Sequence, residues 1–401
     1  MVERTAKPVK VRRCRATVSR ILASQVARPH RDPSAFARKV RSIPITSRPR
    51  RSLPAQGSFF PRALPFILCI ALLIFALGAS VAIGAVPIPT GQLVQLLLRR
   101  PEAANLPASF SSIIWDLRLP RTIFIALLGM SLASSGCAFQ GIFRNPLADP
   151  YLLGIGSGAS LGVALAISIP AFSLGIGSGK PGALPAIPLF AFAGALLTVI
   201  LVYRWVRPGR GSAPSTRLIL AGVAAGAFAQ SLAAFLFYRT REQTQRALSW
   251  LMGGMLIGGW DPVRITLPYI LAGIAVLIVM GRVLNLLQFG DEQAEQTGLN
   301  VARARWVLIT AASLTTAAGV AFGGVIGFIG LAVPHLARLL WGTDYRRLLP
   351  LSTLLGASVL LAADLLARTI LAPQELPVGI VTALLGAPFF FYLLGRRESV
   401  M

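Results

Sequence analysis

The chain has 401 residues, of which 55% are hydrophobic and only 13% charged, and its mean hydropathy is +0.69. A soluble protein of this length needs more charged surface to stay dispersed, so the composition excludes an ordinary soluble globular protein. The hydrophobic residues fall in long blocks, which predicts a multi-span membrane protein whose spans are α-helices.

The net charge of +25 is concentrated at the start of the chain. Residues 1–57 hold fifteen of the 39 Lys and Arg residues and only two acids, Glu3 and Asp32. This segment lacks a sustained apolar face and is rich in Pro and Ser, so we predict that residues 1–60 form a basic, disordered cytoplasmic tail. Attraction to anionic lipid and nucleic-acid binding are alternative interpretations of its charge. A secretory signal is excluded, because the basic region is too long and no small-residue cleavage site follows the first apolar run.

Residues 61–397 are predicted to form one transmembrane permease domain, in which each span needs about 20 apolar residues. The predicted helices cover residues 64–84, 122–142, 152–169, 186–204, 218–238, 265–284, 350–371 and 377–395, together with two from the block 306–342, which turns back near Gly327 to Gly330. The total is ten helices, so both ends of the chain lie on one side of the membrane. The expected fold class is an all-α polytopic membrane protein.

The distribution of Lys and Arg predicts the orientation. With the N-terminus in the cytoplasm, the inner segments after the tail hold thirteen of these residues and the outer segments hold ten. This difference is small, so the predicted orientation depends on the basic tail. The large number of outer arginines needs a cause. One of them, Arg368, lies four residues after Asp364, which predicts an ion pair on one helix face from which the arginine reaches water.

The polar segment after the first span, residues 85–117, is predicted not to cross the membrane. Two apolar runs joined by the polar turn 144–150 follow it. The second of these runs carries Gly154, Gly158 and Gly162 at four-residue spacing, which predicts close helix packing.

The Gly179-Lys180 pair resembles part of a phosphate-binding loop. However, Leu174 stands where the first glycine of G-x-x-x-x-G-K-[ST] belongs, and Pro181 stands where the hydroxyl belongs. This loop is therefore not a nucleotide site, and a transporter with this sequence has to use a separate ATPase.

The span at 218–238 is rich in Ala and Gly, with Gly222 and Gly226 on one face. Small residues let helices approach closely, or they leave a shallow wall beside a cavity, and the composition leaves both interpretations open. Residues 239–263 have a charged start and a Gly-rich end, which predicts an outer re-entrant or short helical element.

The polar interval 285–305 lies between two spans. It contains a helix-forming run from Asp291 to Thr297 that is bracketed by Gly290 and Gly298. A compact exposed helix of this kind suits a cleft on a partner protein, and a solvated loop is the alternative.

The His and Cys residues show no metal-ligand spacing, so we expect no metal and no cofactor on this chain. Cys69 and Cys137 lie in apolar runs and are expected to be small apolar fillers. His335 follows Pro334 and is expected to pack inside a kinked helix, with a substrate-binding or proton-carrying role as the alternative. The segment FIGLAVPH at 328–335 weakly echoes FQGIFRNP at 139–146, which suggests an inverted repeat.

Seven motifs follow one another along the chain. They are RLPR at 118–121, NPLADP at 145–150, LGIGSGASLG at 153–162, LILAGVA at 218–224, GDEQAEQTGL at 290–299, GFIGLAVPHLARL at 327–339 and ELPVGIVTALLGAP at 375–388. Together they resemble the iron-siderophore and vitamin B12 (FecCD/BtuC-like) permeases, the membrane subunits of a class of ABC importers. The resemblance covers residues 62–397 and fails only over the basic tail.

This resemblance implies a type II ABC importer permease with ten helices per subunit, paired as a homodimer or with a sister permease. It implies three further partners: an external substrate-binding protein, two cytoplasmic ATPases that carry ATP and Mg²⁺, and membrane lipid. Nucleic acid is not an expected partner.

The resemblance also implies roles for individual residues. The outer cations that contact glutamates on the two lobes of the binding protein are expected to be Arg118, Arg121 and Arg368. This docking role would explain why so many arginines lie on the outer side. The resemblance implies that a coupling helix in this chain binds in a groove of the ATPase, and it assigns to this element Gly290, Asp291, Glu292, Ala294, Gly298 and Leu299. The helix beside the central pathway, at the subunit interface, contributes Leu218, Gly222, Gly226 and Gln230.

The expected function is ATP-driven import of an iron-siderophore-type chelate, or of heme or cobalamin, by alternating access across the bacterial inner membrane. Both termini are expected in the cytoplasm, and the chain is expected to be a permease subunit rather than an enzyme. An ion-coupled secondary transporter is the alternative. An intramembrane hydrolase that uses Ser157 with His335 is a more distant one, because no orienting acid or oxyanion element accompanies them.

Overall fold

A computed structural model of the chain describes residues 63–84, 86–98, 107–169, 186–206, 214–240, 244–255 and 258–397. The predicted basic tail and the Gly179-Lys180 loop both lie outside the described residues. Within the described ranges every regular element is a helix, which agrees with the predicted all-α class.

Seven helices of the described chain are long and apolar enough to cross a membrane. They are α3 (Leu64–Ala82), α9 (Ala186–Val206), α10 (Pro214–Arg239), α12 (Asp261–Val279), α15 (Val301–Gly323), α17 (Tyr345–Thr369) and a continuous helix, Ser109–Ile142. The continuous helix combines α5 (Ala108–Ser112), the π-helical turn η2 (Ile113–Arg118) and α6 (Leu119–Ile142).

Three shorter apolar helices occupy other predicted spans: α7 (Ile155–Ser168), α16 (Ile329–Trp341) and α18 (Val378–Arg397). The connecting segments contain α4 (Thr90–Leu97), η3 (Pro150–Leu153), α11 (Thr244–Leu251), α13 (Gly281–Leu287) and α14 (Asp291–Gln296).

Four predicted helices or blocks differ in their boundaries from the structure. The long second helix begins at Ser109 rather than at residue 122, inside the segment predicted to be only a polar connection, because η2 continues without a break into α6. The predicted span 152–169 begins at Ile155, because Gly154 has a φ of 79° and separates η3 from α7. The predicted span 265–284 is divided at Met280 between α12 and α13. The block 306–342 turns back after Gly323, a few residues before the predicted turn.

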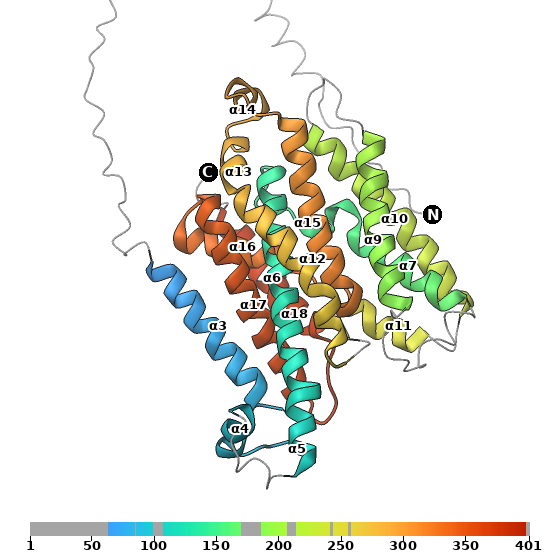
Figure 1. Cartoon of the computed structure of the whole chain (residues 1–401). Helices are drawn as coiled ribbons and strands as arrows, with labels where there is room; N and C mark the ends of the chain where they lie inside the picture. Colours follow the sequence, from blue (N-terminus) through green and yellow to red (C-terminus); the bar gives the residue numbers. More distant parts are fainter. Residues whose placement is uncertain are drawn as a thin grey trace, which may run out of the picture. The chain divides into compact units, whose positions relative to one another are not determined.

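Helix α6 lies in the middle of the bundle and packs against α12, α15, α16 and α17 (Figure 1). Small residues make the closest crossings possible, since backbones can touch where side chains are missing. A second cluster of helices is formed by α7 with α9 and α10. There Gly158 and Gly162 face Gly194 and Phe190 so closely that an added methyl group would overlap the backbone of α9, which confirms the predicted packing role of these two glycines.

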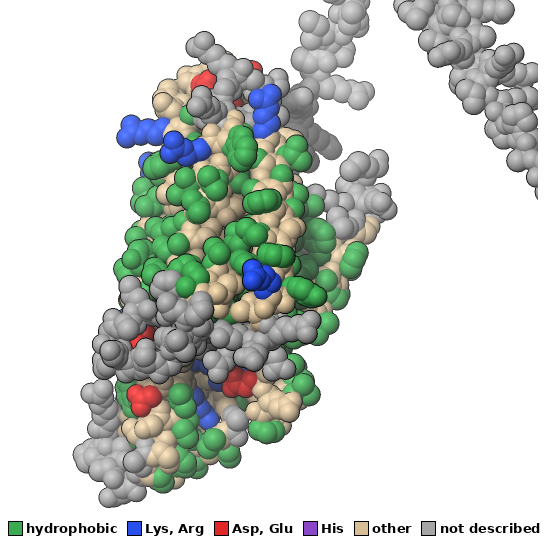
Figure 2. Space-filling view, turned by 90° about the vertical axis from the view of Figure 1, so that its right-hand side faces the viewer, with side chains coloured by type: hydrophobic (Ala, Val, Ile, Leu, Met, Phe, Trp, Pro, Cys, Tyr) green, Lys and Arg blue, Asp and Glu red, His purple; other side chains and the backbone are tan. Residues whose placement is uncertain are grey.

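The two ends of the bundle carry different elements. Figure 1 shows α4 and α5 at one end and α14 at the opposite end. We call the first the arginine end, because Arg118, Arg121, Arg368 and Glu375 gather there, and the second the α14 end. Figure 2 shows hydrophobic side chains over the middle of one face, with most charged side chains toward its two ends, as expected for a protein surrounded by lipid.

Candidate functional site

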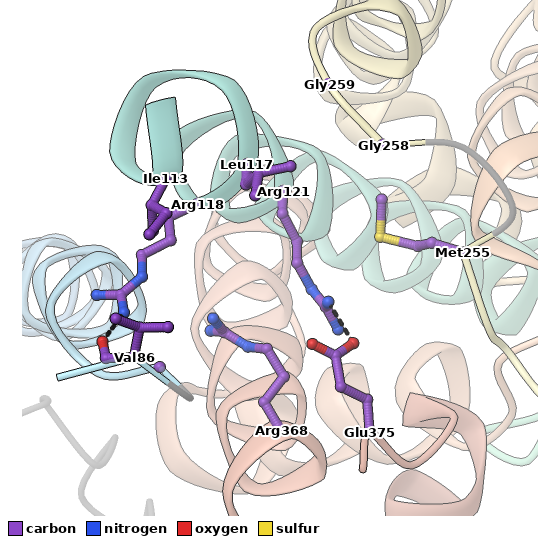
Figure 3. Close-up of a pocket in the computed structure, with 11 residues that line it drawn as sticks. Val86, Ile113, Leu117, Arg118, Arg121, Met255, Gly258, Gly259, Arg368 and Glu375 are labelled. Atoms are coloured by element: carbon purple, nitrogen blue, oxygen red, sulfur yellow. Dashed lines mark hydrogen bonds and ion pairs between the residues drawn. The ribbon is translucent and has the colours of Figure 1, made fainter. Parts of the chain in front are cut away.

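The arginine end contains a cleft of about 350 Å³ that is lined by three arginines (Figure 3). Arg118 and Arg121 lie one helical turn apart at the junction of η2 and α6, and Arg368 comes from the end of α17. Glu375 reaches the same cleft from the connection between α17 and α18.

Asp364 is the acid at the centre of this arrangement. Its carboxylate is completely buried, and one oxygen, Oδ1, accepts from Nε and Nη2 of Arg121 at 3.2 and 2.9 Å. The other oxygen, Oδ2, lies 2.9 Å from Nε of Arg368, which confirms the predicted pair on one helix face. Arg368 also donates to Oγ and the carbonyl oxygen of Ser80 on α3. One acid thereby joins α6 to α17, and the second guanidinium joins α17 to α3.

Arg118 has a different set of partners. Its Nη1 donates to the carbonyl oxygens of Val81 and Ala82 at 3.0 Å each, and its Nη2 donates to the carbonyl oxygen of Val86. These carbonyls belong to the C-terminal end of α3 and to the residues just after it, where a cation is favoured because the last helical carbonyls lack partners. Arg118 therefore holds α3 against η2.

The burial of these arginines corrects one prediction. Arg368 does not reach water in this structure, because its side chain is only 6% exposed between Asp364 and α3. Arg118 is also 6% exposed, whereas the Arg121 side chain is 23% exposed. The sequence brought the three cations to one end of the molecule, but only the structure shows that Arg121 is the accessible one.

Glu375 is the cleft residue that sequence reasoning missed. Its Oε2 lies 2.6 Å from Nη1 of Arg121, and its side chain is 51% exposed. It is the first residue of the ELPVG motif, so a signal was present, but nothing in the sequence indicated that it pairs with an arginine 254 residues away. The cleft thus combines three guanidinium groups with two carboxylates and keeps one net positive charge.

The α14 end presents a short helix between two glycines with positive φ angles, 111° at Gly290 and 86° at Gly298. A side chain is strained in this backbone region, so the glycines allow the chain to turn sharply into and out of α14. Ala294 is the buried residue of α14, and its carbonyl oxygen accepts hydrogen bonds from the backbone N–H groups of Thr297 and Leu299. The predicted helix over Asp291–Thr297 is confirmed to within one residue.

Asp291 fixes α14 to the helical bundle. Its Oδ1 lies 2.9 Å from Nη2 of Arg305 on α15 and 3.5 Å from Nη2 of Arg144, which follows α6. The Arg305 side chain is almost fully buried, whereas Glu292 on the same short helix is exposed. The acidic start of α14 therefore has two different surfaces: Asp291 contacts the bundle and Glu292 faces outward.

Two acids in connections outside the spans have shifted pKa values. Burial raises the pKa of Asp149 to about 6, partly opposed by the hydrogen bond from the backbone N–H of Tyr151. Burial also tends to raise the pKa of Asp344, but its net pKa is lowered. The carboxylate accepts hydrogen bonds from the Asn285 amide and the backbone N–H of Arg346, and nearby arginines favour its charged form. Asp344 also caps α17, and its bond from Asn285 joins that helix to α13.

The residues predicted for the pathway divide between two faces of α10. Leu218, Gly222 and Gly226 are buried; Gly222 approaches the backbone at Leu152, and Gly226 lies beside Ser157 of α7. Gln230 is exposed. The composition of this helix allowed either close helix packing or a wall beside a cavity. Within this chain, the glycine face of α10 is used for helix packing.

Cys69, Cys137 and His335 are all buried in helices. In the described part of the chain, no group of three His, Cys, Asp or Glu side chains could hold a metal ion.

Comparison with known proteins relates these features to a family. Residues 72–396 match the FecCD transport family. The hemin transport system permease protein HmuU of Yersinia pestis is 40% identical over 350 residues, which cover 86% of this chain and 98% of that protein. The cobalamin import system permease protein BtuC of Halobacterium salinarum is 41% identical over 327 residues, which cover 80% of this chain and 85% of that protein.

A solved structure supports the same relationship. It is described as an inward-facing conformation of a metal-chelate type ABC transporter, and it matches with a TM-score of 0.70 and 29% identity over 83% of this chain and 99% of its own. The chain therefore belongs to the FecCD transport family and is a multi-pass membrane permease subunit of an ATP-driven ABC importer, in which a separate subunit is the ATPase.

Proposed function

We propose that this chain imports an iron-siderophore-type chelate, or heme or cobalamin, which an external binding protein delivers and two ATPase subunits drive inward. The observation that carries the proposal is the presence of two contrasting charged surfaces on one bundle, the arginine cleft and the acidic start of α14. Figure 1 shows α5 and α14, the helices beside these two surfaces, at opposite ends of the bundle. The relatives named for hemin and cobalamin import support this class of cargo.

The proposed membrane arrangement has ten spans in the bacterial plasma membrane. The seven long helices cross it, and the shorter apolar helices α7, α16 and α18 complete the count. The arginine end then faces outward, and the α14 end and both termini face the cytoplasm. The resemblance of residues 328–335 to 139–146 supports an inverted repeat within the permease region.

The pathway is proposed to run beside α10 where two permease subunits meet. The exposed face of α10, which includes Gln230, lines the pathway. Leu218, Gly222 and Gly226 lie on the buried face of α10, which packs against α7 and η3. The partner subunit is a second copy of the chain or a sister permease. An ion-coupled secondary transporter is less well supported, because Asp364 is already paired with two guanidinium groups.

We expect Arg121→Gln to weaken docking of the binding protein about tenfold or more, because the accessible guanidinium group that would meet a partner carboxylate is removed. Asp364 keeps its pair with Arg368 in this variant, so the fold is retained. The measurement is the affinity of the purified binding protein of the same importer for the assembled transporter in nanodiscs. Arg264→Gln is the matched control, since Arg264 is an exposed cation at the start of α12. Equal losses in both variants would contradict docking at the cleft.

Reconstitution tests the function as a whole. With its ATPase and binding protein in proteoliposomes, the chain is expected to take up a ferric chelate, heme or cobalamin only with ATP, and Asp291→Asn is expected to reduce this uptake several-fold. The variant leaves the buried Arg305 without its carboxylate, at a cost of about 1 kcal/mol or more, and so loosens α14 from α15. Glu292→Gln, on the exposed side of α14, is the matched control for the loss of one charge. Solute movement by the purified chain alone would overturn the proposal.

A further inference from the structure

The position of Glu375 in the arginine cleft has a consequence for partner binding. Figure 3 shows Arg118, Arg121, Arg368 and Glu375 around one space, with the Glu375 carboxylate beside the guanidinium of Arg121. The Oε2–Nη1 distance is 2.6 Å, so Arg121 already has a carboxylate on its exposed side.

The other contacts of the three arginines restrict where a carboxylate can approach. Nε and Nη2 of Arg121 are occupied by Asp364, which is completely buried. Arg368 is buried between Asp364 and Ser80, and Arg118 is buried against backbone carbonyls. A carboxylate that arrives from solvent at the Nη1 edge of Arg121 therefore meets Glu375, whose Oε2 already accepts from this nitrogen.

We propose that Glu375 is an internal competitor that occupies the place of a partner carboxylate on Arg121 until the binding protein docks. This inference rests on the proposed docking function of the cleft, and it names the chemistry of the partner group: one acidic side chain that exchanges with Glu375. The exchange replaces one carboxylate by another, so the net charge around Arg121 is the same before and after it.

The exchange is easy because the two ion pairs of Arg121 differ in strength. The pair with Glu375 is half exposed to water, and exposed ion pairs open readily. The pair with Asp364 is shielded and keeps the Arg121 side chain in place while Glu375 leaves. Glu375 therefore lowers the apparent affinity for the partner by the fraction of time that it covers Arg121.

Two other roles for Glu375 lead to different results. If Glu375 instead positions Arg121 for docking, its neutralisation weakens docking. If it only repels an acidic partner from a distance, its neutralisation strengthens docking whether or not Arg121 is present. Competition strengthens docking only while Arg121 is present, so a double-mutant cycle separates the three roles.

The experiment measures docking of the purified binding protein to the complete transporter, with its ATPase, in nanodiscs at low salt. The variants are Glu375→Gln, Arg121→Gln and the double variant, and Asp261→Asn is the control because it removes an exposed acid at the start of α12. We expect Glu375→Gln to tighten docking about threefold to fivefold, Asp261→Asn to have little effect, and Glu375→Gln to have no effect in the Arg121→Gln background. If the Arg121→Gln transporter does not assemble, Arg121→Met takes its place in the cycle, because methionine keeps an unbranched apolar stem and has no cation for Glu375 to cover.

Weaker or unchanged docking in Glu375→Gln overturns the inference, as does tightening that persists without Arg121 or is matched by Asp261→Asn. The proposed docking function has a separate test in the same data. If Arg121→Gln alone leaves docking unchanged, the cleft is not the docking site and both proposals fall. If Arg121→Gln weakens docking while Glu375→Gln does not strengthen it, only the competition is wrong.

Discussion

Replacing Gly136 with alanine is expected to destabilise the folded chain by about 3 kcal/mol and to lower its yield as a monodisperse species in detergent. Gly136 of α6 crosses Gly330 of α16 so closely that an added methyl carbon would lie 1.9 Å from the Gly330 carbonyl oxygen. The obstacle is backbone rather than a flexible side chain, so the two helices have to separate. Since α6 lies in the middle of the bundle, their separation disturbs its other helix contacts as well.

The measurement is the thermal unfolding midpoint of the purified full-length chain, followed by size-exclusion chromatography. Gly78→Ala in α3 is the matched control, because nothing lies within 4 Å of the methyl group that it introduces. The control is expected to leave stability unchanged or to raise it by up to about 1 kcal/mol, since alanine favours helix more than glycine does. Equal midpoints for the two variants would show that α6 and α16 do not cross as described.

Asp364→Asn is expected to have a comparable effect at the arginine end, with a loss of about 3–5 kcal/mol. The change removes a buried carboxylate that both Arg121 and Arg368 contact, and among the described residues Arg368 then keeps no ion pair. Glu375 cannot replace it, because Glu375 contacts Arg121 from the exposed side. The contacts between α17, α6 and α3 are weakened together.

Unfolding midpoints of three further variants make this prediction specific. Asp261→Asn removes an exposed acid near the same end and is expected to leave the midpoint almost unchanged, which corresponds to a change in the free energy of unfolding of less than about 0.5 kcal/mol. The double variant Asp364→Leu with Arg368→Met is expected to recover much of the lost stability, because an apolar pair replaces the buried charges. A stable Asp364→Asn variant together with an unstable double variant would contradict this account of the cluster.

The local features of the fold were predictable from the sequence. Long apolar blocks specified most of the helices, because about 20 apolar residues are needed to cross a bilayer and the blocks have that length. The glycines at 290 and 298 marked the short helix α14, because a positive φ is a property of single residues. The pair of Asp364 with Arg368 was predictable as well, since four residues form one turn of one helix.

The contacts between distant segments were decided only by the tertiary structure. The sequence placed Arg118, Arg121 and Arg368 at one end, but not the carbonyl groups that hold Arg118 or the carboxylate of Glu375 that covers Arg121. The same holds for α10, whose glycine face fits either a pathway or a neighbouring helix until α7 is seen against it.

The physical reason is the difference between local and long-range interactions. Spacing along a helix determines which side chains share a face, and hydropathy determines which segments leave water. The sequence by itself therefore determined that this protein is a helical membrane protein with a short polar helix between two spans and an arginine-rich end. The choice of partner across 243 residues, as between Arg121 and Asp364, depends on how two helices approach. That approach is set by packing of the whole bundle, and only the tertiary structure contains it.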